Sequence, residues 1–338
     1  MSGKRIEWID NAKGVAIVLV VLGHIISTDS LLSRFIDSFH MPLFFMLSGL
    51  FVLKKTNDSF RSHLNNRFRR LMIPYFILGI CVLIPFNWLY FHFIIPSAQI
   101  SFLQRCLAHF TGLHSDWGEE WRCCLWFLPC LFVADIVIWS IWKYLYKWRY
   151  VVLLLLISIG IFYYITINRS LPFRIHTASI AVLFLFIGSI LTENIEKISV
   201  WLIGLFCICY TFLWISNDFS SIVMADNNYG LIHLSIPASI FASIAIIYLV
   251  RHIRHNHILS LIGEQSLAIY ILHQLFVSFI RAISLKLSVL GGGGITEAII
   301  MTIIAFLVTL ICMKMGQLLH EKCPWIFGER RNKVYLLS

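Results

Sequence analysis

Charged side chains are scarce in this sequence of 338 residues, because Asp, Glu, Lys and Arg together make up only 13% of it. A typical soluble domain has about 25% charged residues. Acidic residues are the scarcer kind, with 17 Asp and Glu against 27 Lys and Arg, while 59% of all residues are hydrophobic. The low charge argues against an ordinary soluble protein and predicts an all-α integral membrane protein.

Several sequence patterns are also absent. The nine cysteines show no paired, zinc-like spacing, so no metal site is expected. The run Gly291–Gly294 lacks the Gly-Lys-Ser/Thr of a phosphate loop and is typical of a turn. An internal repeat is missing, which disfavours transporters built from duplicated halves. Without a long polar segment, residues 1–338 are expected to form a single transmembrane domain with no separate soluble domain.

Apolar segments dominate the chain instead, and a bilayer core requires about 20 apolar residues per helix. Ten segments approach this length, and they predict a bundle of about ten transmembrane helices. They lie near residues 12–30, 38–54, 71–95, 123–143, 150–167, 177–192, 198–216, 228–250, 258–281 and 296–318.

The basic residues orient these segments. If the N-terminus is cytoplasmic, 20 of the 27 Lys and Arg fall on the inner side. The remaining seven fall in outer loops: Arg34, Arg105, Arg122, Arg169, Arg174, Arg281 and Lys286. This bias predicts that both termini face the cytoplasm. It also explains the basic excess without a nucleic-acid partner.

Lys13 and His24 are polar residues in the first apolar segment. They are 11 residues apart, which is about 1100° of helical rotation and only about 20° past three full turns. They therefore share one helix face, roughly 16 Å apart along the axis. Ionisable groups within a span are costly and are candidates for function. His24 and Lys13 are thus candidates for function.

Further histidines are predicted in the outer half of the bundle. His273 lies in the upper half of the ninth apolar segment. For His40, His176 and His233 a packed, structural imidazole is the favoured interpretation, with its ring bonded to a backbone carbonyl.

The stretch "RFRRLMIPYF" places Arg67, Arg69 and Arg70 at the inner end of the third segment. One interpretation is membrane anchoring through lipid headgroups. The other is an anion-binding cradle, because arginine suits multidentate phosphate contacts. Asp10 and Glu264 are expected at the same level, where they are candidate partners for these cations.

Six stretches together resemble the membrane-bound acyltransferase-three family, in particular its fucose 4-O-acetylase-like branch, which contains bacterial glycan O-acetyltransferases. They are "WIDNAKGVAIVLVVLGHI", "FHMPLFFMLSGLF", "RFRRLMIPYF", "LWFLPCLF", "IGEQSLAIYILHQLF" and "FGERR". The family's marker, Arg or Lys followed by ten residues and His, corresponds to Lys13 and His24. Its arginine motif corresponds to Arg67 and Arg70, its His-Met-Pro segment begins at His40, and its late histidine is His273.

The resemblance implies transfer of an acetyl group from acetyl-CoA to a sugar hydroxyl of a lipid-linked or polymeric envelope glycan. It implies a bacterial inner-membrane enzyme that contacts membrane lipids and uses acetyl-CoA as a substrate, with no bound cofactor. Lys13, Arg67, Arg70 and His40 would bind substrates. His24 would act as general base, or alternatively carry the acyl group itself, and His273 would be the second candidate for catalysis. A succinyl or other acyl donor, and a transporter or flippase of a glycan precursor, are the alternative functions. His273, Arg122 and Ser48 are candidates for stabilising the oxyanion.

Overall fold

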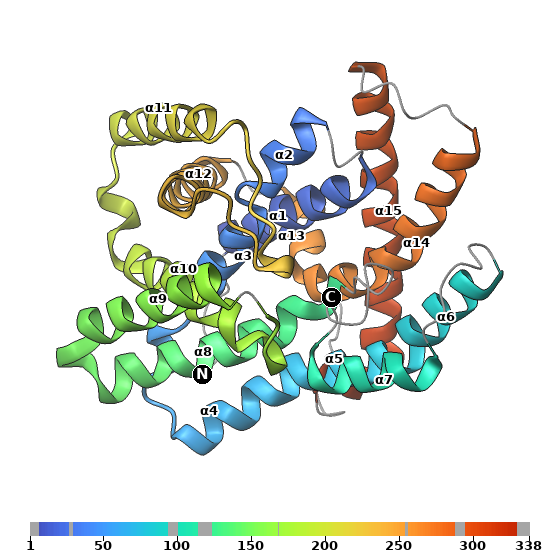
Figure 1. Ribbon diagram of the computed structural model, residues 1–338, viewed down its shortest axis with the longest axis horizontal. Helices are drawn as coiled ribbons and strands as arrows, with labels where there is room; N and C mark the ends of the chain where they lie inside the picture. The colour runs from blue at the N-terminus through green and yellow to red at the C-terminus, as the bar shows by residue number, and fades with distance from the viewer. Residues whose placement is uncertain are drawn as a thin grey trace. The chain divides into compact units, whose positions relative to one another are not determined.

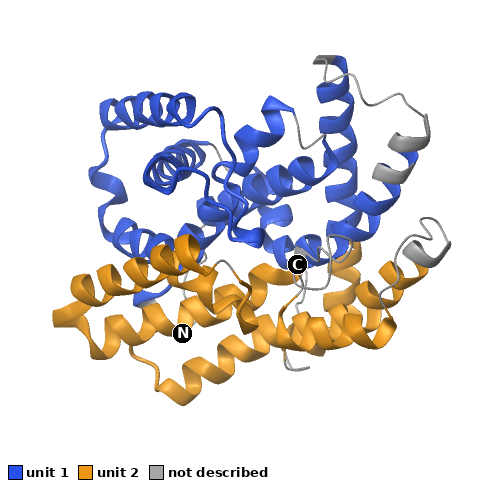
Figure 2. Cartoon of the chain, viewed as in Figure 1, with its two compact units in different colours: residues 1–53, 181–313 blue, residues 54–180, 314–338 orange. Residues whose placement is uncertain are grey.

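The computed structural model describes residues 7–26, 30–93, 101–113, 124–167, 169–253, 256–287 and 295–329. Within these ranges the chain is helical and forms no strand, apart from an isolated bridge between Val223 and Asn228 (Figure 1). The chain forms two compact units, each assembled from separate stretches (Figure 2). Unit 1 comprises residues 1–53 and 181–313, and unit 2 comprises residues 54–180 and 314–338. The prediction of an all-α membrane protein is confirmed.

Seven helical segments within the described residues are long and apolar enough to cross a membrane. They are Trp8–Ile25, Phe60–Leu89, Phe127–Tyr144, Tyr146–Thr166, Pro172–Lys197, Ile232–His252 and Thr296–Lys322. An eighth is the pair His257–Glu264 and Ser266–Ile280, if its 81° bend lies within a single span. The predicted count of about ten is not confirmed. The difference lies at 38–54, where the helix has only 10 residues, and at 198–216, where it has 17.

Unit 1 is built around helix α1 (Glu7–Ile25), most of which is buried. Its other helices are α2 (Leu31–Asp37), α3 (His40–Gly49), α11 (Val200–Ser216), α12 (Ile232–His252), α13 (His257–Glu264) and α14 (Ser266–Leu287), with parts of α10 (Ile175–Asn194) and α15 (Ile295–Lys322). Helix α1 (Glu7–Ile25) packs against α2, α3, α12, α13 and α14. The fold thus surrounds the helix that carries both Lys13 and His24.

Glycines let the helices of unit 1 approach closely. A β-carbon at Gly263 would overlap the carbonyl oxygen of Asp10, and one at Gly14 would overlap that of Leu259. The backbones of α1 and α13 are therefore in direct contact, as is common where small residues meet between membrane helices. This contact fixes the Lys13 end of α1 against α13.

Unit 2 contains α4 (Phe60–Arg67), α5 (Ile73–Leu78), α6 (Ile84–Phe93), α7 (Phe102–Thr111), α8 (Phe127–Tyr144) and α9 (Arg149–Thr166). Two π-helical turns, Phe68–Met72 and Gly79–Leu83, interrupt the long helical segment from α4 to α6. Each turn ends two residues before a proline, Pro74 or Pro85. A proline ring clashes with the carbonyl four residues earlier, and a π-turn relieves this clash by widening the helix.

The short 3₁₀ turns complete the described structure. They are Leu53–Lys55, Cys124–Trp126, Tyr146–Trp148, Pro172–Arg174, Ile195–Lys197, Met224–Asp226 and Pro324–Phe327.

Candidate active site

The imidazoles of His24 and His273 meet in unit 1. Their rings stack with centroids 5.3 Å apart and planes inclined by 29°. His24 lies in the last turn of α1 and is half-buried, whereas His273 lies within α14 and is fully buried. The two catalytic candidates are therefore neighbours in space, although they are 249 positions apart in the sequence.

Hydrogen bonding fixes the tautomer of His273. Its Nδ1 lies 3.0 Å from the carbonyl oxygen of Ile269. A carbonyl oxygen only accepts, so Nδ1 carries the proton and donates it. In the neutral ring the other nitrogen, Nε2, is then an acceptor, and it has no hydrogen-bond partner among the described residues. The neutral His273 ring can therefore accept a further hydrogen bond or proton through Nε2 alone.

Lys13 lies on the same unbroken helix as His24, so the predicted rise of roughly 16 Å between them applies. Its Nζ is 3.5 Å from Asp10 Oδ1 and 5.1 Å from the centre of the Phe51 ring. The Lys13 side chain is 29% exposed to solvent. Asp10 is thus a partner of Lys13, and the ammonium group remains accessible.

His40 begins helix α3 and is buried. Its Nδ1 donates to the carbonyl oxygen of Ile36 at 3.0 Å and lies 3.5 Å from Asp37 Oδ1. These contacts tie α3 to the end of α2. They agree with the structural interpretation of this histidine, and they leave its predicted role in substrate binding untested.

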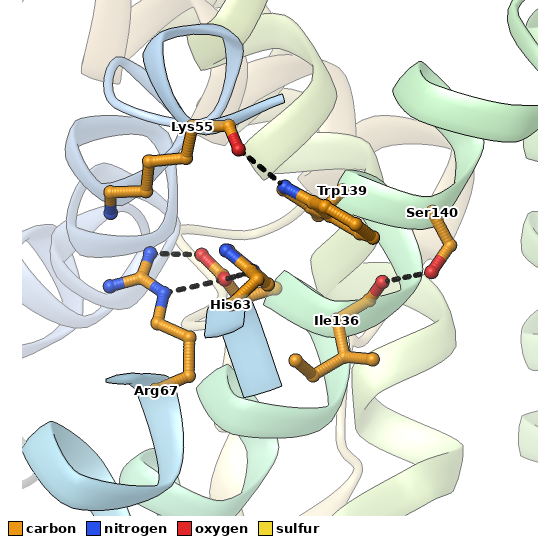
Figure 3. A network of polar contacts seen from close by, with 7 residues as sticks. Lys55, His63, Arg67, Ile136, Trp139 and Ser140 are labelled. Atoms are coloured by element: carbon orange, nitrogen blue, oxygen red, sulfur yellow. Dashed lines mark hydrogen bonds and ion pairs between the residues drawn. The ribbon is translucent and has the colours of Figure 1, made fainter. Parts of the chain in front are cut away.

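Arg67 has a different environment in unit 2, where a buried carboxylate holds it (Figure 3). Its Nε donates to Asp135 Oδ1 at 2.6 Å, and its Nη2 donates to Asp135 Oδ2. His63 Nε2 donates to the same Oδ1 at 2.8 Å. The His63 ring stacks on Trp139 at 4.7 Å, and the Trp139 indole N–H donates to the carbonyl oxygen of Lys55. The bidentate face of Arg67 is therefore occupied by a protein carboxylate.

Arg70 differs from Arg67 because its side chain is exposed. Arg69, between them, contributes its backbone to a contact with the C-terminal segment, since a β-carbon at Gly328 would overlap the Arg69 carbonyl oxygen. Of the two arginines predicted to bind substrate, Arg70 thus has the side chain that is open to a ligand in unit 2.

The remaining sequence candidates are dispersed. His176 is buried and accepts a hydrogen bond from the Leu171 N–H, while His233 is exposed. Ser48 is half-buried on α3. Arg122 and Gly291–Gly294 lie outside the described residues.

His63 and the pairing of Arg67 with Asp135 were not predicted from the sequence. The sequence does carry a signal for His63, because this histidine precedes Arg67 by four residues and so shares its helix face. Asp135 is the acidic residue within α8, and a buried carboxylate there needs a cation.

Comparison with known proteins supplies one match. A family model described as an acyltransferase domain matches residues 6–314, which include every candidate residue above. No curated protein and no solved structure shows a significant match. Among the described residues, no group of three or more His, Cys, Asp or Glu is arranged to hold a metal ion.

Proposed function

Because this chain belongs to the acyltransferase-3 family, whose members transfer acyl groups, we propose that it moves an acetyl group from acetyl-CoA to a hydroxyl of a cell-envelope glycan. We place it in the fucose 4-O-acetylase-like branch of that family, on the resemblance of its motifs. Its proposed location is a bacterial inner membrane, with both termini in the cytoplasm. The observation that carries the proposal is the stacked pair His24 and His273.

The chemistry follows from a neutral imidazole beside the acceptor. His24 takes the proton of the sugar hydroxyl while the hydroxyl oxygen attacks the thioester carbon. The tetrahedral intermediate then collapses, the carbon–sulfur bond breaks, and the departing thiolate takes the proton from the imidazolium. The products are a sugar ester and free coenzyme A. His273 holds the His24 ring through the stack, and its own orientation is fixed by Ile269.

Stacking also restricts the charge of the pair. If both rings were protonated, two positive charges would lie about 5 Å apart, and like charges at that distance disfavour one another. Only one of the two rings is therefore expected to be a protonated imidazolium at a time. The pair then works as a single proton acceptor, with His24 as the group that touches substrate.

Lys13 is proposed to contact a phosphate of the donor. It lies three helical turns from His24, a separation suited to a donor whose anionic end and reactive thioester are joined by a long arm. Arg70 is a proposed phosphate ligand in unit 2 on the basis of its exposure. Arg67 is proposed to contribute to donor binding mainly by shaping the backbone around Arg70, because its guanidinium pairs with Asp135.

The direct test uses the full-length protein in lipid nanodiscs with radiolabelled acetyl-CoA and isolated envelope polysaccharide. We expect alkali-labile label in the polysaccharide. If the label remains in acetyl-CoA when the wild-type protein is tested with several polysaccharides, acetyl transfer to glycans is excluded. Repeating the assay with succinyl-CoA distinguishes the alternative donor.

A further inference from the structure

An open pocket of about 500 Å³ lies in unit 1, between α2 and the loop that joins α11 to α12. Its size is within the range of about 300–1,000 Å³ typical of small-molecule sites. Six residues that line it carry hydroxyl, amide or charged side chains: Arg34, Ser216, Asn217, Asp218, Ser220 and Ser221. The stacked histidines are not part of its lining.

The lining suits a neutral, hydroxyl-rich ligand. Serine and asparagine side chains both donate and accept hydrogen bonds, as sugar hydroxyls do. Arg34 and Asp218 have opposite charges that cancel, and within the described part of the chain neither forms a salt bridge. A site for the phosphates of coenzyme A would instead need an excess of cations. The pocket therefore fits an acceptor sugar better than the donor.

The loop that forms the pocket is held in place at several points. The Trp214 indole N–H donates to the Ser220 carbonyl oxygen at 3.2 Å, and the Leu231 N–H donates to Asn217 Oδ1 at 3.4 Å. Asp218 and Phe219 both adopt left-handed backbone conformations, with φ of 51° and 53°. Non-glycine residues keep such conformations only where their surroundings enforce them, and these often occur at ligand sites.

An aromatic cluster supports this loop from behind. Trp214 stacks on Tyr210 at 5.8 Å and meets the edges of Phe35 and Phe219 at 5.6 and 5.0 Å. Phe35 follows Arg34 on α2, and Phe219 follows Asp218 in the loop. The cluster thus fixes the two charged residues of the pocket relative to each other before any ligand binds.

Helix α2 also connects the pocket to His24. A β-carbon at Gly23 would lie 3.2 Å from Ile36 Cγ2 and 3.5 Å from Asp37 Oδ1, so the end of α2 rests against the residue before His24. Arg34 lies one turn earlier on the same short helix, which is about 10 Å long. The pocket and the stacked histidines are thus neighbours of a single helix within one unit.

From this juxtaposition we infer that the pocket is an acceptor subsite. It binds a sugar residue that does not react, and it thereby presents the hydroxyl of an adjoining residue to His24. The inference rests on the proposed function. It adds that the acceptor is an oligosaccharide or polysaccharide rather than a single sugar, because neither His24 nor His273 lines the pocket, so a sugar bound there is not the one that reacts.

The test compares Arg34→Gln and Asp218→Asn with matched controls, Arg251→Gln and Glu196→Gln. The control residues form a salt bridge with each other in unit 1 and do not line the pocket. The probes are p-nitrophenyl glycosides of common hexoses, 6-deoxyhexoses and N-acetylhexosamines, as mono- and disaccharides, with radiolabelled acetyl-CoA. Each pocket variant should raise the acceptor KM for disaccharides tenfold or more, as expected for a lost charge-assisted hydrogen bond. The KM for acetyl-CoA and the melting temperature should stay at wild-type values.

The experiment distinguishes failure of the acceptor subsite from failure of acyl transfer itself. Pocket variants that transfer acetyl groups with an unchanged acceptor KM would overturn the subsite while leaving acyl transfer intact. If the wild-type protein acetylates none of the glycosides, the proposed function fails for this panel. Saturation-transfer NMR of the same glycosides then decides the subsite: binding lost in Asp218→Asn but kept in Glu196→Gln supports it, and binding that is absent or equal in both overturns it.

Discussion

The His24 ring stacks on the His273 ring at 5.3 Å, and the Nε2 atom of His273 has no hydrogen-bond partner among the described residues. The pair joins the end of α1 to the middle of α14. It brings together two groups able to exchange protons.

Replacing His24 tests its role as the base. His24→Ala and His24→Gln should lower acetyl transfer by about 10²–10⁴-fold, the usual effect of losing a positioned base. Acetyl-CoA binding should persist, because the proposed phosphate contacts lie elsewhere. Binding and ester formation are measured on the same purified variant. Near-normal ester formation by folded His24→Ala would refute the assignment and make His273 the next candidate.

His273→Asn tests whether the second ring positions the first. Asparagine retains a donor for the Ile269 carbonyl oxygen but has no ring to stack. We expect kcat to fall by about tenfold or more and the pH–rate profile to shift, with the KM for acetyl-CoA unchanged. Residues that act as a unit are not additive, so His24→Ala/His273→Asn should be no slower than His24→Ala alone. Additive losses would mean that the two rings act independently.

The proposed contact between Lys13 and the donor is tested by measuring the KM for acetyl-CoA. Lys13→Ala should raise the KM for acetyl-CoA tenfold or more through loss of a charge-assisted contact, and Lys13→Arg should retain activity. Lys197→Ala is the control, because Lys197 is an exposed lysine of the same unit, bonded to Asn194. If Lys13→Ala leaves the donor KM at the wild-type value, the residue serves its ion pair with Asp10 instead.

Substitutions of Arg67 and Arg70 should affect different properties, the first stability and the second donor binding. Arg67→Ala leaves the Asp135 carboxylate buried without its guanidinium, which typically costs about 3–5 kcal/mol, so the melting temperature should fall. Arg67→Ala/Asp135→Asn should recover part of that loss. Arg70→Ala should leave the melting temperature unchanged and raise the KM for acetyl-CoA, with exposed Arg61→Ala as the control. An unaltered melting temperature in Arg67→Ala would show that the ion pair contributes little to stability.

Acid should weaken the attachment of α7. Burial lowers the pKa of His109 from 6.5 to about 4, while its hydrogen bond to the Tyr75 carbonyl oxygen opposes the shift. Below pH 6.5 the unfolded segment binds a proton that the folded one does not, so stability falls as the pH drops from 6.5 towards 4. Hydrogen exchange of α7 should accelerate over that range. The acceleration should be much smaller in His109→Gln, which retains a donor but does not titrate; an equal acceleration would assign it to other groups.

Local features of this fold were predictable because they depend on neighbours in the sequence. The first helix, the shared face of Lys13 and His24, and the membrane class all follow from composition and helical periodicity. The pairing of His24 with His273 and of Arg67 with Asp135 depends on packing between distant segments, which periodicity does not encode. The predicted span count is not confirmed for a related reason, since α3 and α11 are apolar but shorter than a full span.

The central position of α1 has a consequence for biogenesis. Translation proceeds at about 5–20 residues per second, so α1 enters the membrane tens of seconds before its partners α13 and α14 are made. Throughout that interval Asp10, Lys13 and His24 must be shielded from lipid by something other than their final neighbours. Until α14 is inserted, this helix is therefore expected to depend on the insertion machinery, and a ribosome stalled before residue 263 would leave it exposed to membrane quality-control proteases.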